Sequence, residues 1–160
     1  MLSKPIWGWV NIFIGGCHIR ASYLTDVPFD LLDGFIDCMV NHKTVAIDFD
    51  EEGSSGYLVL NGVVAYVFTV QEDVKAENDQ FYVGDLAREL VKDIQDNIDD
   101  WARWGTRNEP SDDTRFCGYE NEVSIRKAEL LGKCKLIECI LDRGYTGNYR
   151  DWETDRKSVV

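Results

Sequence analysis

Three acidic side chains in the segment AIDFDEEGSSG (residues 46–56) have a spacing that could bind a divalent cation. If Asp48 is the first position of a calcium loop of the EF-hand type, Asp50 and Glu52 fall at its third and fifth positions and a glycine falls at its sixth. The twelfth position is Val59, which has no carboxylate to complete the coordination sphere. We therefore favour a solvated hairpin loop, and we keep Asp48, Asp50 and Glu52 as an alternative metal site.

A second acidic cluster lies in a segment with helical periodicity. Like-charged neighbours destabilise a helix by about a few tenths of a kcal/mol per pair. Anions near the C-terminal end of a helix are also disfavoured by the helix dipole. A basic protein, a cation or the basic side of a later helix could offset these costs. Solvated or internally paired carboxylates are the simpler interpretation. The functional hypothesis is that the cluster binds a basic protein through Asp93, Asp96, Asp99 and Asp100.

The cysteines do not form a recognisable metal or disulfide framework. Their number is odd, no two have C-x-x-C spacing, and only His18 and His42 could complete a zinc site. This pattern favours buried free thiols in a reducing cytoplasm. The five cysteines are Cys17, Cys38, Cys117, Cys134 and Cys139.

No set of residues has catalytic spacing, so we assign no catalytic residues. Cys17 and His18 are adjacent in an expected strand and would point to opposite faces. Cys38 and His42 are four residues apart near the end of an expected helix, but no third group that would orient the histidine can be named. No Gly-rich phosphate loop follows a strand, and we expect no cofactor.

Composition restricts the class of partner. The chain has 160 residues, 44% of them hydrophobic, which suffices for one domain with a core. It has 17 basic and 29 acidic residues and a net charge of −12, whereas binding to a phosphate backbone requires clustered Lys and Arg. We expect a basic protein partner, no nucleic acid and, without a lipid anchor, no membrane. No apolar run is long enough to span a bilayer.

The N-terminus fits two different structures. Residues 1–17 have a positive start, an apolar stretch and the sequence IGGC, and they resemble a bacterial lipoprotein signal in which Cys17 would carry the lipid. The alternation of residues 6–14, the pair Gly15-Gly16 and the strand-like residues after it instead predict a β-hairpin. We favour the hairpin. One face would carry Trp7, Trp9, Asn11 and Phe13, and the other Ile6, Val10, Ile12 and Ile14.

Periodicity predicts further strands and helices. Asp26 and Pro28 mark the start of a helix with an apolar stripe from Leu31 to Val40. Asn61-Gly62 is typical of a type I′ turn between two strands. The expected strands are 44–50, 57–60 and 63–70, with a short edge strand at 81–83. The other expected helices are 84–101 and 120–141. The second of these has a stripe of Leu130, Cys134, Ile137 and Leu141, although 136–141 could instead be a strand.

The expected order is β-β-α-β-β-β-α-α. It predicts an α+β fold, with an antiparallel β-sheet of about five strands and two or three amphipathic helices packed on it. We expect a single domain over residues 1–142 and a loop or a truncated continuation over 143–154. Residues 155–160, DRKSVV, resemble a reading frame through a common sequencing adapter, so we interpret them as a non-native tail.

These observations favour a small acidic protein-binding module without a catalytic site. Immunity or inhibitor proteins that neutralise a basic toxin or nuclease are comparable in size and charge, and the comparison is one of class only. One alternative is an enzyme that uses a divalent metal at Asp48, Asp50 and Glu52. Another is an envelope lipoprotein anchored at Cys17.

Overall fold

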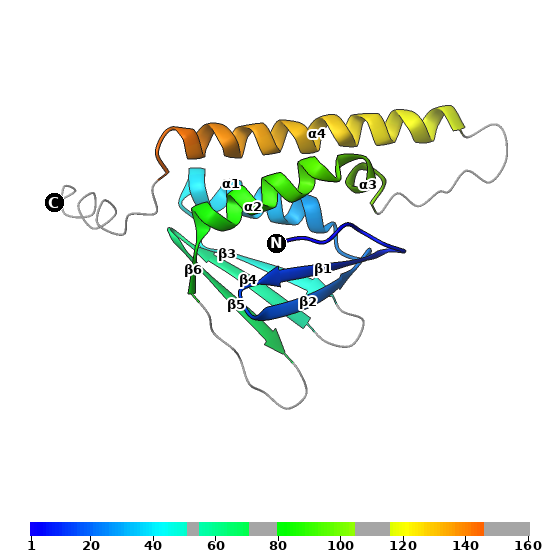
Figure 1. Ribbon diagram of the computed structural model, residues 1–160. Helices are drawn as coiled ribbons and strands as arrows, with labels where there is room; N and C mark the ends of the chain where they lie inside the picture. Colours follow the sequence, from blue (N-terminus) through cyan, green and yellow to red (C-terminus); the bar gives the residue numbers. More distant parts are fainter. Residues whose placement is uncertain (51–54, 71–79, 105–115, 146–160) are drawn as a thin grey trace.

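A computed structural model of the chain describes residues 1–50, 55–70, 80–104 and 116–145. The fold is α+β, as the sequence predicts, and its helices lie on one side of the main sheet (Figure 1). In chain order the elements are β1 (Trp9–Ile14), β2 (Cys17–Ser22), α1 (Val27–Asn41), β3 (Val45–Asp50), β4 (Ser55–Asn61), β5 (Val64–Val70), β6 (Gln80–Tyr82), α2 (Val83–Asp96), α3 (Ile98–Arg103) and α4 (Phe116–Asp142).

The described strands form two antiparallel sheets, whereas the sequence predicted one sheet of about five strands. β1 and β2 pair with each other, and β3, β4, β5 and β6 form the second sheet in that order. In the second sheet Ile47, Leu58 and Val67 lie side by side on the buried face. Alternation of polar and apolar residues is the same whether strands join one sheet or face each other across a core, so the pattern could not distinguish the two arrangements.

The β1–β2 hairpin and α1 share the inner face of the four-stranded sheet. A Cβ atom on Gly56 of β4 would lie only 2.6 Å from Cγ2 of the buried Ile19 on β2. A Cβ atom on Gly34 of α1 would lie 2.6 Å from Cδ1 of Ile47 on β3. Glycine at these two positions therefore allows the hairpin and the helix to pack closely on the sheet.

The expected helix at 84–101 is two helices, which separate at Asn97. The Asn97 side-chain amide donates a hydrogen bond to the Asp93 carbonyl oxygen at 3.2 Å, so it competes for a backbone acceptor.

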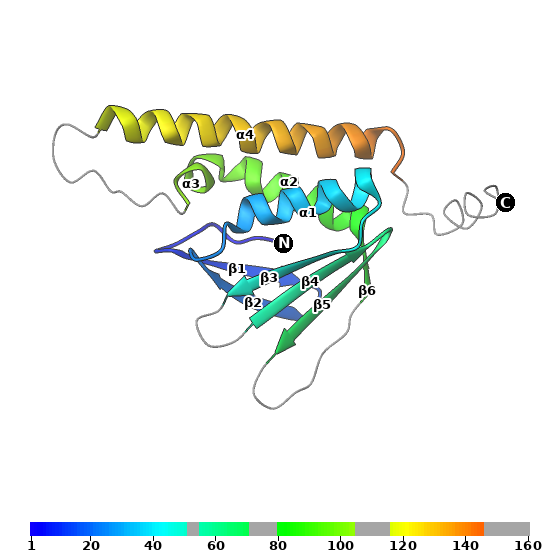
Figure 2. The same ribbon diagram turned by 180° about the vertical axis from the view of Figure 1, so that it is seen from behind.

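α4 is helical throughout, and the alternative strand at 136–141 is wrong. α4 lies across α1, α2 and α3 on the side away from the sheet (Figures 1 and 2). Its buried side chains include the predicted stripe of Leu130, Cys134, Ile137 and Leu141.

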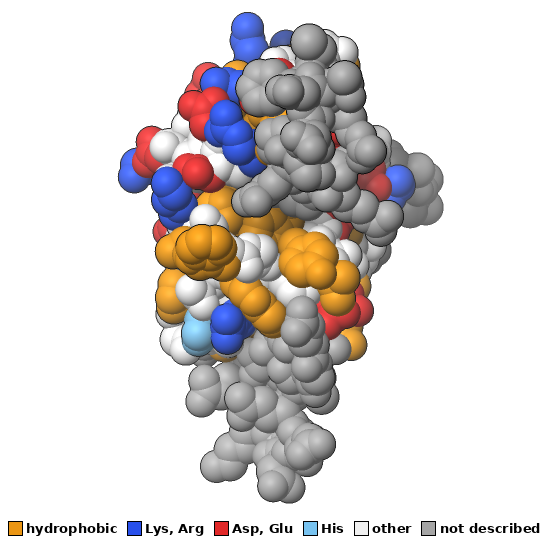
Figure 3. All heavy atoms as spheres, turned by 90° about the vertical axis from the view of Figure 1, so that its right-hand side faces the viewer, with side chains coloured by type: hydrophobic (Ala, Val, Ile, Leu, Met, Phe, Trp, Pro, Cys, Tyr) orange, Lys and Arg blue, Asp and Glu red, His pale blue; other side chains and the backbone are white. Residues whose placement is uncertain are grey.

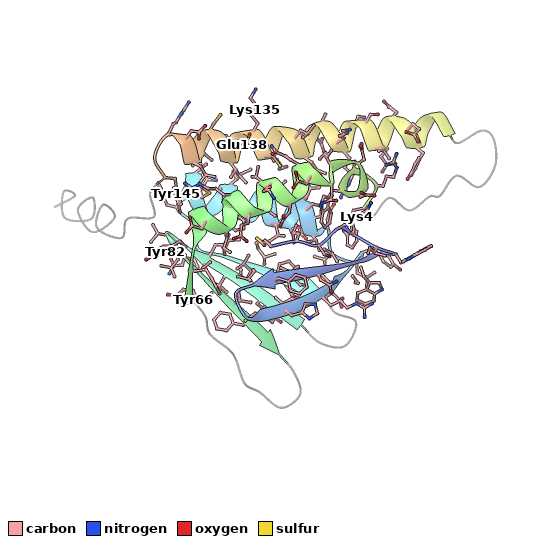
Figure 4. The ribbon with its side chains drawn as sticks, in the orientation of Figure 1. Lys4, Tyr66, Tyr82, Lys135, Glu138 and Tyr145 are labelled. Carbon is pink, nitrogen blue, oxygen red and sulfur yellow. The ribbon has the colours of Figure 1, made fainter. Side chains whose placement is uncertain are left out.

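Residues 143–145, for which the sequence predicted a loop or a truncated continuation, contact the rest of the fold through Tyr145. The Tyr145 hydroxyl donates a hydrogen bond to the Gly62 carbonyl oxygen at 2.6 Å, and the Cys38 thiol donates to the same oxygen at 3.3 Å. Figure 4 shows Tyr145 at the opposite end of the molecule from Lys4. The expected tail at 155–160 lies outside the described residues. Among the described helices, none combines the length and the apolar character that a bilayer crossing requires.

Candidate interaction surface

Each aspartate of the predicted acidic site forms an ion pair within the protein. These cations offset the like-charge repulsion that motivated the prediction of a basic partner. One of these cations, Lys127, belongs to α4. The sequence analysis had named the basic side of a later helix as one possible partner of the cluster. Binding of a basic protein at this cluster stays a prediction. The pairs are Asp93 with the Met1 amine at 2.8 Å, Asp96 with Lys92 at 3.5 Å, Asp99 with Lys127 at 2.7 Å, and Asp100 with Lys4 at 3.0 Å.

Three of these pairs connect distant parts of the chain, and only the pair of Asp96 with Lys92 is local. Asp93 on α2 accepts from the Met1 amine and from the Leu2 backbone N–H at 2.6 Å, which fixes the N-terminal segment against α2. The hydrogen bond and the charge of Lys127 hold the pKa of Asp99 below its usual range. Asp93 and Asp99 therefore each join segments that are far apart in the sequence.

The alternative metal site is only partly described. Asp48 and Asp50 lie on the exposed face of β3, and Glu52 lies outside the described residues. Within the described segments, no group of three or more His, Cys, Asp and Glu side chains has a geometry that could hold a metal ion. The three-carboxylate site stays a prediction.

The cysteine–histidine pairs do not come together. Cys17 is buried, whereas His18 is exposed and its Nε2 lies 2.9 Å from Oδ1 of Asn11. The Cys38 thiol bonds a backbone carbonyl, and His42 caps the end of α1 with a φ of 53°. Cleavage before Cys17, as a lipoprotein signal requires, would remove β1, which pairs with β2 along its full length. The lipoprotein alternative stays a prediction.

The structure contains an exposed surface that the sequence analysis did not select as a site. The chain turns back between Ile6 and Trp9, whose backbone groups bond each other at 2.8 and 3.0 Å. The two central residues, Trp7 and Gly8, have φ values of 52° and 78°, as a type I′ turn requires. Trp7 is 94% exposed. A bulky residue rarely adopts this left-handed backbone conformation. At Trp7 the conformation places the indole ring in solvent.

Other large apolar side chains are exposed along the hairpin, from this turn to Phe13 near its Gly15-Gly16 end. Ile6, Phe13, Tyr23 and Leu24 are each more than half exposed. Figure 3 shows hydrophobic side chains gathered on this end of the molecule beside a histidine and a basic side chain. We call this surface the aromatic hairpin patch and define it as Ile6, Trp7, Trp9, Phe13, His18, Arg20, Tyr23 and Leu24.

Several rings of the patch are held by specific contacts. The Tyr23 ring lies against Gly8, where a Cβ atom would be 2.9 Å from Cδ1 of the ring. The guanidinium of Arg20 lies 4.1 Å from the centroid of the Trp9 ring, a cation–π contact. Phe13 stacks on the imidazole of His18 with centroids 4.9 Å apart and planes 9° from parallel. Trp9 and Phe13 thus each contact a side chain on the neighbouring strand, an arrangement that stabilises the hairpin.

The sequence did contain a signal for this patch. The expected hairpin is apolar on both faces, with aliphatic side chains on one and aromatic side chains on the other. The aliphatic residues Val10, Ile12 and Ile14 are buried, so the aromatic face is the solvent face. Ile6, which was expected on the aliphatic face, is instead 59% exposed, because the chain reverses at Trp7-Gly8 before β1 begins.

The chain was compared with protein-family models, with curated proteins and with solved structures, and no match was found.

Proposed function

We propose that this protein is a protein-binding module and that the aromatic hairpin patch is its contact surface. The observation that carries the proposal is Trp7, 94% exposed at a backbone φ of 52°. A non-glycine residue in this conformation costs about 1–2 kcal/mol. Burial of this indole by a partner would provide a favourable term that the isolated chain lacks.

The composition of the patch supports the same proposal. Trp, Tyr and Arg are the residue types that contribute most binding energy in protein–protein interfaces, and the patch contains Trp7, Trp9, Tyr23 and Arg20. Contiguous exposed apolar surface marks an interaction site more often than single exposed residues do. The contacts that hold Tyr23, Trp9 and Phe13 reduce the side-chain entropy that binding would otherwise cost.

Pull-down from a lysate of the producing cells tests this proposal with three matched baits. These are the wild-type chain, Trp7→Asn, and a control, Ile125→Ser, which removes an exposed apolar side chain from α4. We expect the wild type and the control to recover the same protein and Trp7→Asn to lose it. Equal recovery by Trp7→Asn would contradict the proposal. A fourth bait, the double variant Asp99→Asn/Asp100→Asn, tests the acidic cluster, which would be favoured if this bait lost the partner and Trp7→Asn kept it.

A further inference from the structure

The distribution of charge sets the hairpin apart from the rest of the protein. Residues 1–25 contain no Asp or Glu, although the whole chain has 29 acidic residues. The same residues contain Lys4, His18 and Arg20. Lys4 pairs with Asp100 at 3.0 Å, so Arg20 is the cation of this segment that remains for an external anion.

Arg20 differs from most of the basic side chains that the structure describes. Lys43, Lys92, Arg126 and Lys127, for example, each pair with a carboxylate. No carboxylate in the described part of the chain forms an ion pair with Arg20. Its guanidinium instead lies over the Trp9 ring, which covers one face of the planar group and leaves the N–H edges free to donate.

On these grounds we infer that the partner presents an acidic segment to the patch, with a carboxylate that accepts from Arg20 and an apolar side chain that packs beside Trp7 and Tyr23. This inference rests on the proposed function and specifies the chemistry of its partner. An Arg guanidinium binds a carboxylate in a bidentate geometry with charge-assisted hydrogen bonds. The two contact points belong to neighbouring positions of one hairpin, because Tyr23 bonds Gly8 and Trp9 pairs with Ser22, two residues from Arg20.

Charge also argues against a second copy of the chain, a nucleic acid or an anionic membrane as the partner of this surface. A symmetric contact between two copies would bring the two patches, and with them two copies of Arg20, to the same interface. A nucleic acid or an anionic membrane would meet few cations on a chain with a net charge of −12. A short acidic segment is compatible, because at physiological ionic strength charges more than about 8 Å away are largely screened.

The test uses a displayed library of random peptides selected on the full wild-type chain. Enriched peptides are synthesised, and their affinity is measured by calorimetry for the wild type, Trp7→Asn, Arg20→Gln and Arg20→Lys. We expect enriched peptides to combine Asp or Glu with an aromatic or aliphatic residue. Trp7→Asn should weaken them at least about 30-fold, the effect of a hot-spot residue.

A double-mutant cycle isolates the contact with Arg20. Replacing the peptide carboxylate by its amide should weaken binding to the wild type about tenfold and have little effect on binding to Arg20→Gln. Arg20→Lys keeps the charge but loses the bidentate geometry, so its sensitivity to the loss of the peptide carboxylate should lie between those of the wild type and Arg20→Gln. If Trp7-dependent peptides are neutral or basic, or if the cycle shows no coupling, the inference about the acidic segment is wrong and the proposed function remains.

Other outcomes would contradict the proposed function itself. One is that no enriched peptide loses affinity in Trp7→Asn, or that no peptide is enriched. Another is that vesicles of zwitterionic or anionic phospholipid bind the wild type and release Trp7→Asn. A third is self-association in sedimentation experiments that disappears in Trp7→Asn, which would assign the patch to a second copy of the chain.

Discussion

The guanidinium of Arg20 lies 4.1 Å from the centroid of the Trp9 ring, on the outer face of the β1–β2 hairpin. Within the described residues, no acidic side chain competes with the indole for this cation, although the chain has a net charge of −12. The acidic cluster on α2 and α3 shows the opposite arrangement, because its carboxylates are paired internally. We therefore propose the aromatic surface as the contact surface, and binding of a basic protein at the acidic cluster stays a prediction.

Gly8→Ala should destabilise the fold by about 1–2 kcal/mol. The residue has a φ of 78°, and the new Cβ would lie 2.9 Å from the Tyr23 ring, which must then move. Chemical denaturation measures the change. Gly16→Ala is the control, because its Cβ has no neighbour within 4 Å, and it should change the free energy of unfolding by less than about 0.5 kcal/mol. Equal effects of the two substitutions would contradict this description of the turn.

Gly56→Ala should separate the hairpin from the sheet locally and destabilise the protein by about 1–3 kcal/mol, the usual cost of overpacking. The added methyl would lie 2.6 Å from Ile19, which is buried. Gly132→Ala makes the same chemical change in α4, where the Cβ meets nothing within 4 Å, and should stabilise by about 0.5–1 kcal/mol. Denaturation should give changes in the free energy of unfolding of opposite sign for the two variants. Changes of the same sign would show that the hairpin does not pack on β4 this closely.

Local pattern was sufficient to predict most elements of this fold but not their assembly. The stripe of Leu130, Cys134, Ile137 and Leu141 marked the buried face of α4, since helical spacing alone determines which side chains share a face. The packing of Ile19 on Gly56 depends on residues 37 positions apart, for which periodicity contains no information. The same limit explains the acidic cluster, where Lys127 and Lys4 approach Asp99 and Asp100 only after the chain has folded.

Lys127→Met should raise the pKa of Asp99 toward the ordinary value of about 3.9. The hydrogen bond and the charge of Lys127 lower this pKa in the folded state. The pair therefore stabilises the fold above the unfolded pKa, and this contribution is lost as the pH falls through the lower, folded pKa. The stability difference between wild type and Lys127→Met should shrink on acidification below about pH 4.

NMR titration of the carboxyl resonances and denaturation at several pH values check this expectation. Lys135→Met on α4 is the control, because Lys135 has no ion pair in the described part of the structure. It should leave the Asp99 pKa unchanged. An Asp99 pKa that is the same in wild type and Lys127→Met would show that the pair does not form in solution.

Thiol reagents should modify Cys139 faster than Cys17, Cys38 or Cys134 in the native protein. Cys139 is exposed, whereas the other three are buried. Burial also raises the pKa of Cys134 to about 11, so little of the reactive thiolate forms at neutral pH. Peptide mass mapping after brief alkylation measures the rates, in a Cys117→Ser background. Modification of Cys134 as fast as Cys139 would contradict the packing of α4 against the core.

The most direct test of the account is to measure stability and binding together in Trp7→Asn. Asn-Gly is a favoured pair for a type I′ turn, so the substitution should relieve the cost of tryptophan at a φ of 52°. We expect the free energy of unfolding to rise by about 0.5–1 kcal/mol, while the affinity for a selected acidic peptide falls at least about 30-fold. A variant that is less stable than the wild type but binds the peptide equally well would mean that Trp7 supports the fold and has no role in recognition.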